Sequence, residues 1–387
     1  MGQMKILQTN KLYYPVTGGI ERVVQQLAEG LSDWTSTTVL VCRKKGKTTW
    51  EQVNGVPVLR CKTLVNVSSL PISLSYLHYF KKEAKKNDIV HIHMPFPLGD
   101  LACLLSGYKG KIVLWWHSDI VRQERMMVLY RPLMNWLLRR ADAIVVATEG
   151  HIKGSKYLKP YAGKCKIIPY GVDGWIKQQA DTFLAQKTEE TAKEKIKNPV
   201  RFLFVGRLVY YKGVRNLLEA CYQLVSQEPQ LKAKIVVDIV GSGPLEEELH
   251  KYVSEKGLQD LILFHTQVSD EQLMEFYKNC DVFVLPSQQR SEAFGLVQIE
   301  AMAFGKPVIN TNLPSGVPYV SQDGITGLTV EPSDREGLAQ ALKKLTIDDE
   351  CRTRMGQAAR QRVEDEYTME KMLQKTYALY KELESEE

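Results

Sequence analysis

Long apolar runs and cysteine motifs are both missing from the 387-residue sequence. No stretch approaches the ~18 consecutive apolar residues of a membrane-spanning helix, and the beginning, MGQMKILQTN, is typical of a β-strand rather than a signal peptide. The seven cysteines show no CxxC spacing, and Cys103, Cys221 and Cys280 lie inside apolar stretches. We therefore expect a soluble globular enzyme with buried thiols in a reducing cytosol.

The sequence also lacks the signatures of two common ligand classes. The segment TGGIER does not have the GxGxxG spacing of a dinucleotide site, and no matching acid is evident, which disfavours a nicotinamide enzyme. The net charge is +6, and part of the excess lies in CRKKGK, FKKEAKK, LLRR and HIKGSKYLK. No nucleic-acid signature accompanies these clusters. They are either solvated faces or a surface for anionic lipid headgroups.

What the sequence does contain is an alternation of short β-rich apolar runs with helical stretches, which predicts βαβ units and parallel sheets. The first half holds the candidate strands MKILQTN, TTVLVCR, DIVHIHM, KIVLWWH, AIVVAT and CKIIPYG. After a polar, lysine- and glutamate-rich stretch, the alternation restarts with VRFLFVGRL, AKIVVDIVG, LILFHTQV, DVFVLPS and PVINTN. The predicted fold class is α/β, with two consecutive doubly wound, Rossmann-like domains of similar size.

The polar stretch sets the predicted domain boundaries. We expect a first domain over residues 1–173, a linker over 174–198, a second domain over 199–365 and a terminal helix over 366–387 that packs across the junction. Ligands of such sheets bind beyond the carboxyl ends of the strands, so we expect the site in a cleft between the two domains.

Two loops at predicted strand ends are suited to anions. Gly18 and Gly19 precede a helix that we expect from about Ile20, where main-chain N–H groups and the helix N-terminus can meet an anion; a plain turn is the alternative. Arg207 follows the strand VRFLFVG directly, and Lys212 lies in the next loop. Arginine in bidentate geometry and lysine as a point charge can together bind a diphosphate.

The segment SEAFGLVQIE places Glu292 and Glu300 eight residues apart, with a helix expected from Phe294 or Gly295. If the segment is helical throughout, eight residues span ~12 Å and turn the two side chains ~80° apart. The paired carboxyls of a glycosidase lie roughly 5 to 9.5 Å apart across one bond, so the spacing disfavours a hydrolase. The N–H groups of Phe294, Gly295 and Leu296 can instead hold a phosphate, with Glu300 on a ribose and Glu292 on a sugar beyond it. Surface glutamates are the alternative.

These elements resemble the retaining glycosyltransferases of family 4, which have the GT-B fold. The resemblance covers essentially the whole chain and is carried by Gly18, Gly19 and Glu21, by the Arg207/Lys212 pair and above all by Glu292-x7-Glu300 with its internal Phe-Gly-Leu. It implies two Rossmann-like domains facing across a cleft, a donor bound chiefly by the second, an acceptor bound chiefly by the first, and no metal or other cofactor.

The resemblance also implies roles for single residues. Glu300 would bind the ribose, Glu292 the transferred sugar, and Arg207 and Lys212 the diphosphate. The remaining residues implied for the donor site are Gly18, Gly19, Gly206, Gly241, Gly243, Gln267, Val268, Phe294, Gly295 and Leu296.

His117 follows a predicted strand end, where a family member typically places a histidine against the transferred sugar. A structural histidine is the alternative. The segment WHSDIVRQ followed by LYRPL resembles a bacterial subgroup that contains α-mannosyltransferases of O-antigen or capsule assembly, which makes Asp119, Arg122 and Gln123 candidates for the acceptor side. His91 and His93 alternate along a strand without a third ligand nearby, so we do not expect a metal pair.

We therefore expect a hexosyltransferase with His117, Glu292, Arg207 and Lys212 in catalytic roles. GDP-mannose is the expected donor and UDP-sugars are the alternative. The expected acceptor is a glycan or polyprenyl-diphosphate-linked glycan at the cytoplasmic face of the membrane, with peripheral contact through basic and apolar residues. A phosphorylase or epimerase of the same fold and a non-catalytic nucleotide-sugar-binding subunit remain as rival functions.

Overall fold

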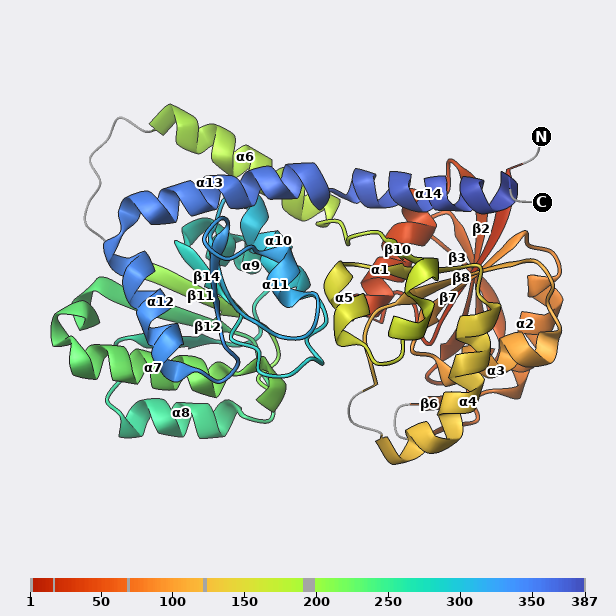
Figure 1. The fold of residues 1–387 in the computed structure, drawn as a ribbon, viewed down its shortest axis with the longest axis horizontal. Helices are drawn as coiled ribbons and strands as arrows, with labels where there is room; N and C mark the ends of the chain where they lie inside the picture. Colours follow the sequence, from red (N-terminus) through yellow and green to blue (C-terminus); the bar gives the residue numbers. More distant parts are fainter. Residues whose placement is uncertain (1–2, 17, 68–69, 121–123, 191–198, 386–387) are drawn as a thin grey trace. The chain divides into compact units, whose positions relative to one another are not determined.

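The structure, a computed structural model, describes residues 3–16, 18–67, 70–120, 124–190 and 199–385. The chain forms two compact units. The first comprises Met1–Pro169 together with Glu370–Glu387, and the second comprises Tyr170–Met369. Each unit has a sheet covered by helices, and the last helix, blue in Figure 1, runs along the first unit.

The first unit is built on an eight-stranded sheet, counted over the described residues, with the order β10-β9-β8-β7-β1-β2-β4-β3. Every pairing is parallel except β3 with β4, and β5 and β6 form a separate antiparallel hairpin. The strands are β1 (Met4–Asn10), β2 (Thr35–Arg43), β3 (Thr49–Val53), β4 (Val56–Lys62), β5 (Val65–Val67), β6 (Leu70–Ile72), β7 (Ile89–Met94), β8 (Lys111–Trp116), β9 (Ala143–Val146) and β10 (Cys165–Ile167).

The two faces of this sheet are covered differently. Helices α2, α3 and α4, which stand in a row in Figure 1, bury a large apolar core against one face. On the opposite face, α1 packs on the strands through Val24 and Ala28, and α14 reaches β7 through Tyr380. The helices are α1 (Gly19–Gly30), α2 (Leu74–Ala84), α3 (Pro97–Ser106), α4 (Glu124–Arg140), α5 (Glu149–Gly154), the 3-10 helix η1 (Lys159–Lys164) and α14 (Met369–Ser385).

The second unit has a fully parallel six-stranded sheet, in the described part of the chain, with the order β13-β12-β11-β14-β15-β16. The buried runs of β-branched and aromatic residues suit strands that are covered on both faces. The strands are β11 (Val200–Val205), β12 (Ile235–Val240), β13 (Ile262–His265), β14 (Val282–Val284), β15 (Val308–Thr311) and β16 (Gly327–Val330).

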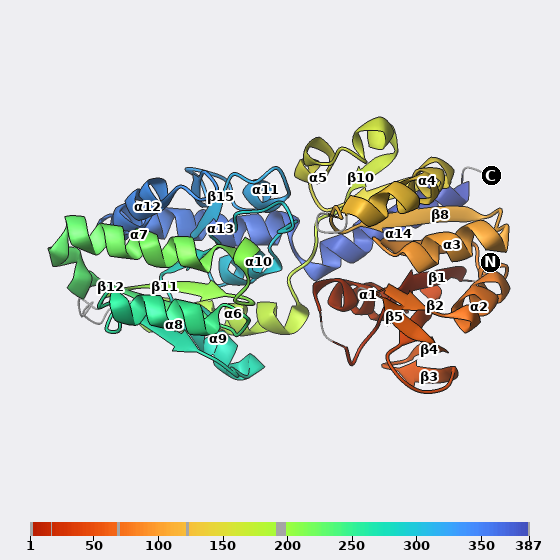
Figure 2. The same ribbon diagram turned by 90° about the horizontal axis from the view of Figure 1, so that it is seen from below.

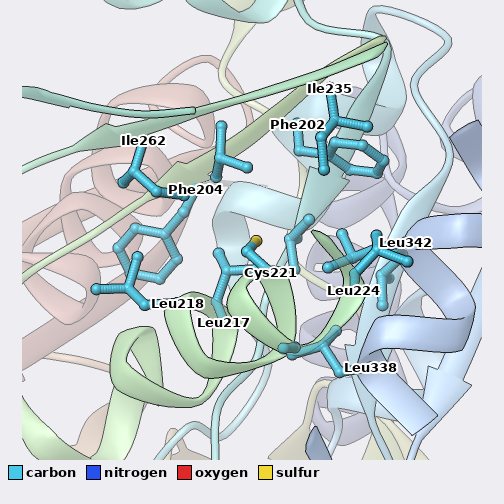
Figure 3. Packing of buried hydrophobic residues seen from close by; sticks show 14 of the residues in the cluster. Phe202, Phe204, Leu217, Leu218, Cys221, Leu224, Ile235, Ile262, Leu338 and Leu342 are labelled. Carbon is cyan, nitrogen blue, oxygen red and sulfur yellow. The ribbon is translucent and has the colours of Figure 1, made fainter. Parts of the chain in front are cut away.

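One face of this sheet carries the main core of the second unit. Phe202 and Phe204 of β11 belong to this core together with Leu217 and Leu218 of α7, and all four are labelled in Figure 3. Helices α7 and α8 lie side by side in Figures 1 and 2, and the Arg215 guanidinium stacks over a tyrosine ring of α8 at 3.8 Å. The helices are α6 (Gly174–Glu190), η2 (Tyr210–Lys212), α7 (Val214–Gln227), η3 (Pro229–Lys234), α8 (Glu246–Glu255), α9 (Asp270–Asn279), α10 (Leu296–Ala303), α11 (Val317–Val320), α12 (Arg335–Ile347) and α13 (Asp349–Glu366).

The predicted α/β class with two parallel-sheet units is confirmed, but several details differ from the sequence prediction. The predicted linker begins with helix α6, which packs on α9 and α10 and buries Ile176 and Ala180 within the second unit. The remainder of that stretch, residues 191–198, lies outside the described residues. Strands β3 to β6 and β16 are absent from the prediction. Strands β3, β5, β6 and β16 are short or exposed. Strand β4 is seven residues long and mostly buried, but Pro57 and Arg60 interrupt its apolar run.

Candidate active site

Lys212 is held in place by contacts between two loops at the carboxyl ends of β11 and β14. The lysine ends the short helix η2, and the next residue, Gly213, has a positive φ of 68°. A Cβ at Gly213 would lie 1.9 Å from the carbonyl oxygen of Pro286, so the two loops meet backbone against backbone and only glycine fits. The Gln288 amide donates to the Tyr210 carbonyl at 2.6 Å and joins the same loops.

Lys212 and Glu292 form a nearly buried ion pair. The Nζ and Oε2 atoms are 2.5 Å apart, and the side chains are 13% and 9% exposed. Burial by itself lowers the pKa of a lysine, but the adjacent Glu292 carboxylate outweighs burial and raises the pKa of Lys212 above its ordinary value. The Ser287 hydroxyl also donates to Glu292 Oε2 at 3.2 Å. The two predicted site residues are therefore brought together, although they are 80 positions apart.

The N-terminus of α10 lies in the loop that carries Glu292. Its N-cap is Gly295, at a φ of 75°, and over the described residues no side chain caps the first turn. The helix begins at Leu296, so the expectation of a start at Phe294 or Gly295 is early by one or two residues. Phe294 is buried and its ring makes an edge-on contact with Tyr170, 4.9 Å between centroids. This fixed helix start presents the partial positive charge that anions favour.

Glu300 lies inside α10 and is 8% exposed. The Tyr277 hydroxyl on α9 donates to its Oε2 at 2.7 Å. Glu292 precedes the helix, so the two glutamates occupy different structural settings: one forms an ion pair with a lysine, and the other accepts a hydrogen bond from a tyrosine.

Three glycines shape the loops that follow β11 and β12. Gly241 has a φ of 138°, and a Cβ there would lie 2.0 Å from the Gly206 carbonyl oxygen. A Cβ at Gly243 would lie 2.5 Å from the Leu208 carbonyl oxygen. These glycines let the two loops touch through their main chains, and they leave Arg207 exposed at the carboxyl edge of the sheet.

Two further predicted donor residues follow the neighbouring strand β13. Gln267 is exposed and adopts a positive φ of 54°, which non-glycine residues seldom do. Val268 is partly buried. Their main chain lies at the same carboxyl edge as Arg207, since all strands of this sheet are parallel.

In the first unit, Gly18 and Gly19 begin helix α1. Gly18 is the N-cap in an extended conformation, and over the described residues no side chain caps the helix. A Cβ at Gly18 would lie 2.3 Å from Glu21 Oε2, so this carboxylate folds back over the first turn. An acidic group there is stabilised by the helix dipole and competes with any external anion.

His117 follows β8 and is 5% exposed. Its Nε2 is 2.9 Å from Nδ1 of His93, which lies on the neighbouring strand β7. Burial lowers the pKa of His117 to about 3, and the nearby His91 and His151 act in the same direction. The ring is therefore a neutral imidazole at physiological pH.

The acceptor-side candidates are only partly covered by the structure. Asp119 follows His117 closely and accepts a hydrogen bond from the Trp116 indole at 3.0 Å. Arg122 and Gln123 lie outside the described residues.

Sequence reasoning did not identify the partners of the predicted residues. In the second unit these are Ser287, which donates to Glu292, and Tyr277, which donates to Glu300. In the first unit they are His93 beside His117 and Tyr380 beside His91. His91 and His93 were considered only as a metal pair. His91 instead lies 2.5 Å from the Tyr380 hydroxyl, and His93 contacts His117. One sequence signal could have indicated the contact between His93 and His117. His91 and His93 alternate along one strand, and the neighbouring strand ends just before His117.

The described residues offer neither a metal-binding cluster nor a membrane-spanning helix. No group of three or more histidine, cysteine, aspartate or glutamate side chains among them is placed to hold a metal ion. No helix in the described ranges is long and apolar enough to cross a membrane.

Comparison with known proteins places this arrangement in a family. Residues 17–174 match the model "Glycosyltransferase Family 4", and residues 186–362 match "Glycosyl transferases group 1". The chain is 32% identical over 382 residues to O-antigen chain mannosyltransferase C of Escherichia coli, covering 97% of this chain and 98% of that protein. It is 34% identical over 369 residues to D-rhamnosyltransferase WbpZ of Pseudomonas aeruginosa, covering 94% of this chain and 92% of that one.

The fold agrees with these sequence matches. The Anabaena protein Alr3699/HepE, solved in complex with UDP, superposes with a TM-score of 0.75 at 17% identity, covering 98% of this chain and 100% of the other. The predicted resemblance and GT-B fold class are thereby confirmed. The chain belongs to glycosyltransferase family 4 and is a glycosyltransferase.

Proposed function

We propose that the protein is a retaining hexosyltransferase that moves mannose from GDP-mannose to a glycan or lipid-linked glycan during cell-surface polysaccharide synthesis. Membership of family 4 and the similarity to an O-antigen chain mannosyltransferase support the sugar and the pathway class. The observation that carries the proposal is the Lys212–Glu292 ion pair beside the uncapped start of α10, since it sets a cation, an anion and a helix N-terminus side by side.

The ion pair suggests how the donor enters. A diphosphate arriving at the helix start would replace Glu292 as the partner of Lys212, with the exposed Arg207 as a second cation. Glu292 is then released to accept hydrogen bonds from the hydroxyls of the transferred sugar. Glu300 would accept from the ribose. Charge that develops on the departing diphosphate is stabilised by Lys212, Arg207 and the helix N-terminus, and one well-aimed group of this kind contributes about 3 kcal/mol.

The transfer step in this proposal needs no metal and no protein nucleophile. The bond between the sugar anomeric carbon and the β-phosphate oxygen breaks through an oxocarbenium-like transition state. The acceptor hydroxyl attacks from the same face and gives its proton to the leaving phosphate oxygen. The products are the glycoside with retained configuration and the nucleoside diphosphate.

An assay with a panel of nucleotide sugars tests this function. GDP-mannose should be consumed in the presence of a polyprenyl-diphosphate-linked glycan, EDTA should leave the rate unchanged, and NMR of the product should show the donor's anomeric configuration. Glu292→Ala and Lys212→Ala should each lower turnover at least ~100-fold. Near-normal turnover in both variants would contradict the catalytic roles proposed for Glu292 and Lys212.

A UDP-sugar donor is the second candidate, and one observation favours it: the structurally similar Anabaena protein was solved with UDP. Faster turnover of a UDP-sugar than of GDP-mannose in the same panel would select this candidate.

We also propose peripheral contact with the cytoplasmic membrane face through the first unit. Near the start of α4, Val128 and Leu129 are 75% and 86% exposed, and the helix ends in Arg139 and Arg140. Exposed apolar side chains combined with basic ones suit anionic lipid. Sedimentation with phosphatidylglycerol vesicles should carry the protein down, and Leu129→Ser should weaken this; equal binding to neutral vesicles would contradict an electrostatic contribution.

A further inference from the structure

One face of the sheet in the first unit carries a row of imidazoles. His93 pairs in register with Trp115, and the His117 N–H donates to the Met94 carbonyl at 3.1 Å, so β7 and β8 stay paired as far as His117. Alternate residues of a strand point to opposite faces. His91 and His93 therefore share one face with Trp115 and His117, whereas Ile92 and Met94 enter the apolar core on the other face.

The rings of this row are closely stacked. Successive centroids are 4.7 Å apart for His91 and His93 and 5.2 Å apart for His93 and His117, each pair within 16° of parallel. The Trp115 indole is stacked with all three imidazoles at 5.8 to 6.1 Å. Packing on this indole leaves the rings little freedom to flip.

The contact between His93 and His117 couples the protons on the two rings. Both rings are neutral, because burial lowers the pKa of His117 to about 3 and, with the charges of its neighbours, lowers that of His93 well below its ordinary range. A bond between His93 Nδ1 and His117 Nε2 needs one N–H and one lone pair. Each ring has only one N–H, so whichever nitrogen donates decides the tautomer of both.

The surroundings of His93 favour one of the two arrangements. Its Nε2 is buried and has no hydrogen-bond partner among the described residues. A buried lone pair without a donor is less costly than a buried N–H without an acceptor, so His93 carries its proton on Nδ1. We propose that His93 is a positioning residue that donates this proton to His117 Nε2 and thereby holds His117 in its Nδ1–H tautomer.

The consequence for sugar transfer rests on the proposed function. In this tautomer His117 is a hydrogen-bond donor through Nδ1, and it can therefore bind a lone pair of a sugar hydroxyl. Because the ring is neutral across the physiological range, it adds no charge that would repel an oxocarbenium-like transition state. His93 touches no substrate in this account and acts only through His117.

The tautomer can be measured directly without a substrate. The protein, labelled with ¹⁵N in histidine, gives two-bond ¹H–¹⁵N correlations that distinguish a protonated ring nitrogen from a bare one. His93→Phe keeps a planar ring against Trp115 but removes the N–H. His93→Asn retains an amide N–H near the former Nδ1. His91→Phe is the matched control on the same strand and face, since His91 contacts Tyr380 rather than His117.

The wild-type protein and His91→Phe should both show His117 protonated at Nδ1. His93→Phe should lose this single tautomer and lower kcat/KM roughly tenfold, the cost of about one hydrogen bond, whereas His93→Asn should restore both to within about threefold. A wild-type His117 protonated at Nε2, or an unchanged tautomer in His93→Phe, would overturn the proposal. If His93→Phe does not fold, the spectra of the wild-type protein and His93→Asn decide. A correct tautomer in a protein that transfers no sugar would count against the proposed function alone.

Discussion

The two units share one architecture, a largely or fully parallel sheet with helices on both faces, but they differ in the polar groups that they bury. The first unit buries a row of neutral imidazoles along β7 and β8, in addition to Arg60 and Glu83, which are each ion-paired. The second unit buries Lys212 with Glu292 as a pair, and it buries Asp238 beside Arg201, which is 38% exposed. The imidazole row and these pairs of the second unit lie on strands or in the loops that follow them. The fold therefore supplies positions, and the side chain at each position decides whether a buried group keeps its charge beside a partner or becomes neutral.

Lysine, glutamate and histidine side chains respond differently to burial, and this explains the difference between the two units. A lysine or glutamate keeps its charge inside a protein only beside a partner, as in the second unit. A histidine instead gives up its proton, because its ordinary pKa lies close to neutral pH. The first unit should accordingly be sensitive to acid, and the second to removal of one member of a pair.

The largest expected effect is acid destabilisation of the first unit. Burial lowers the pKa of His91 and His117 to about 3 and that of His151 to about 4, and it lowers the pKa of His93 as well. The unfolded chain binds protons at these four sites below pH ~6.5, whereas the folded unit does not. Asp100 acts in the opposite direction, because burial raises its pKa to about 7 and the folded unit keeps a proton that the unfolded chain releases.

The net uptake on unfolding is thus about three protons, so stability should fall by about 4 kcal/mol as the pH drops from 6 to 5. Hydrogen exchange at these two pH values, corrected for the intrinsic rates, should show loss of protection in β7 and β8 before β11 and β12. Equal loss of hydrogen-exchange protection in both sheets would show that acid does not destabilise the first unit selectively.

The second prediction concerns the Lys212–Glu292 pair. Lys212→Met should destabilise the second unit by about 3 kcal/mol, because it leaves Glu292 charged and nearly buried without its partner. The double variant Lys212→Met/Glu292→Gln should recover most of this stability, and turnover should remain at least ~100-fold low. Urea unfolding gives the stability, and a double variant as unstable as the single one would argue against a coupled pair.

A third prediction compares two glycines. Gly241→Ala should cost about 2 kcal/mol, since Gly241 has a positive φ and its Cβ would meet the Gly206 main chain. Gly18→Ala should cost less than about 1 kcal/mol, because its backbone is extended and only the Glu21 side chain must move. Thermal unfolding of both variants measures the difference; similar losses would mean that the loops after β11 and β12 can separate without strain.

The smallest expected effect compares two tyrosine hydroxyls. Tyr277→Phe removes a donor to the Glu300 carboxylate and should cost about 2 kcal/mol, while Tyr380→Phe removes a bond to the neutral His91 and should cost about 1 kcal/mol. Tyr277→Phe should also weaken nucleotide binding, and Tyr380→Phe should not. Calorimetry with GDP and UDP provides this second measurement, and the reverse order would show that charge does not distinguish the two sites.

Sequence patterns predicted the fold where local physics is strong. The apolar runs of β8 and β12 each predict a buried parallel strand, and both are present. The composition of helix α6 is polar and predicts a linker, and the exposed strand β3 has no apolar run that would predict a strand. In such segments packing against neighbouring elements, rather than composition, decides the structure.

For the candidate site, too, the sequence predicts single residues but not the contacts between them. Lys212 and His117 are predicted from residue type and position after a strand, and Glu292 from its spacing to Glu300 and the family resemblance. The functional roles assigned to them remain proposals. Their partners were not identified, because no local pattern reports a distance across 80 residues or between neighbouring strands. Arg207 is exposed at the carboxyl edge of the same sheet, and its role beside Lys212 stays a prediction.

By itself the sequence determined which chemical groups the protein has and which stretches become strands, because side-chain chemistry and periodicity are properties of short segments. Only the tertiary structure decided which of these groups meet. The Gly213 turn and the pairing of β7 with β8 bring Lys212 to Glu292 and His93 to His117, and burial there sets the charge that each group carries.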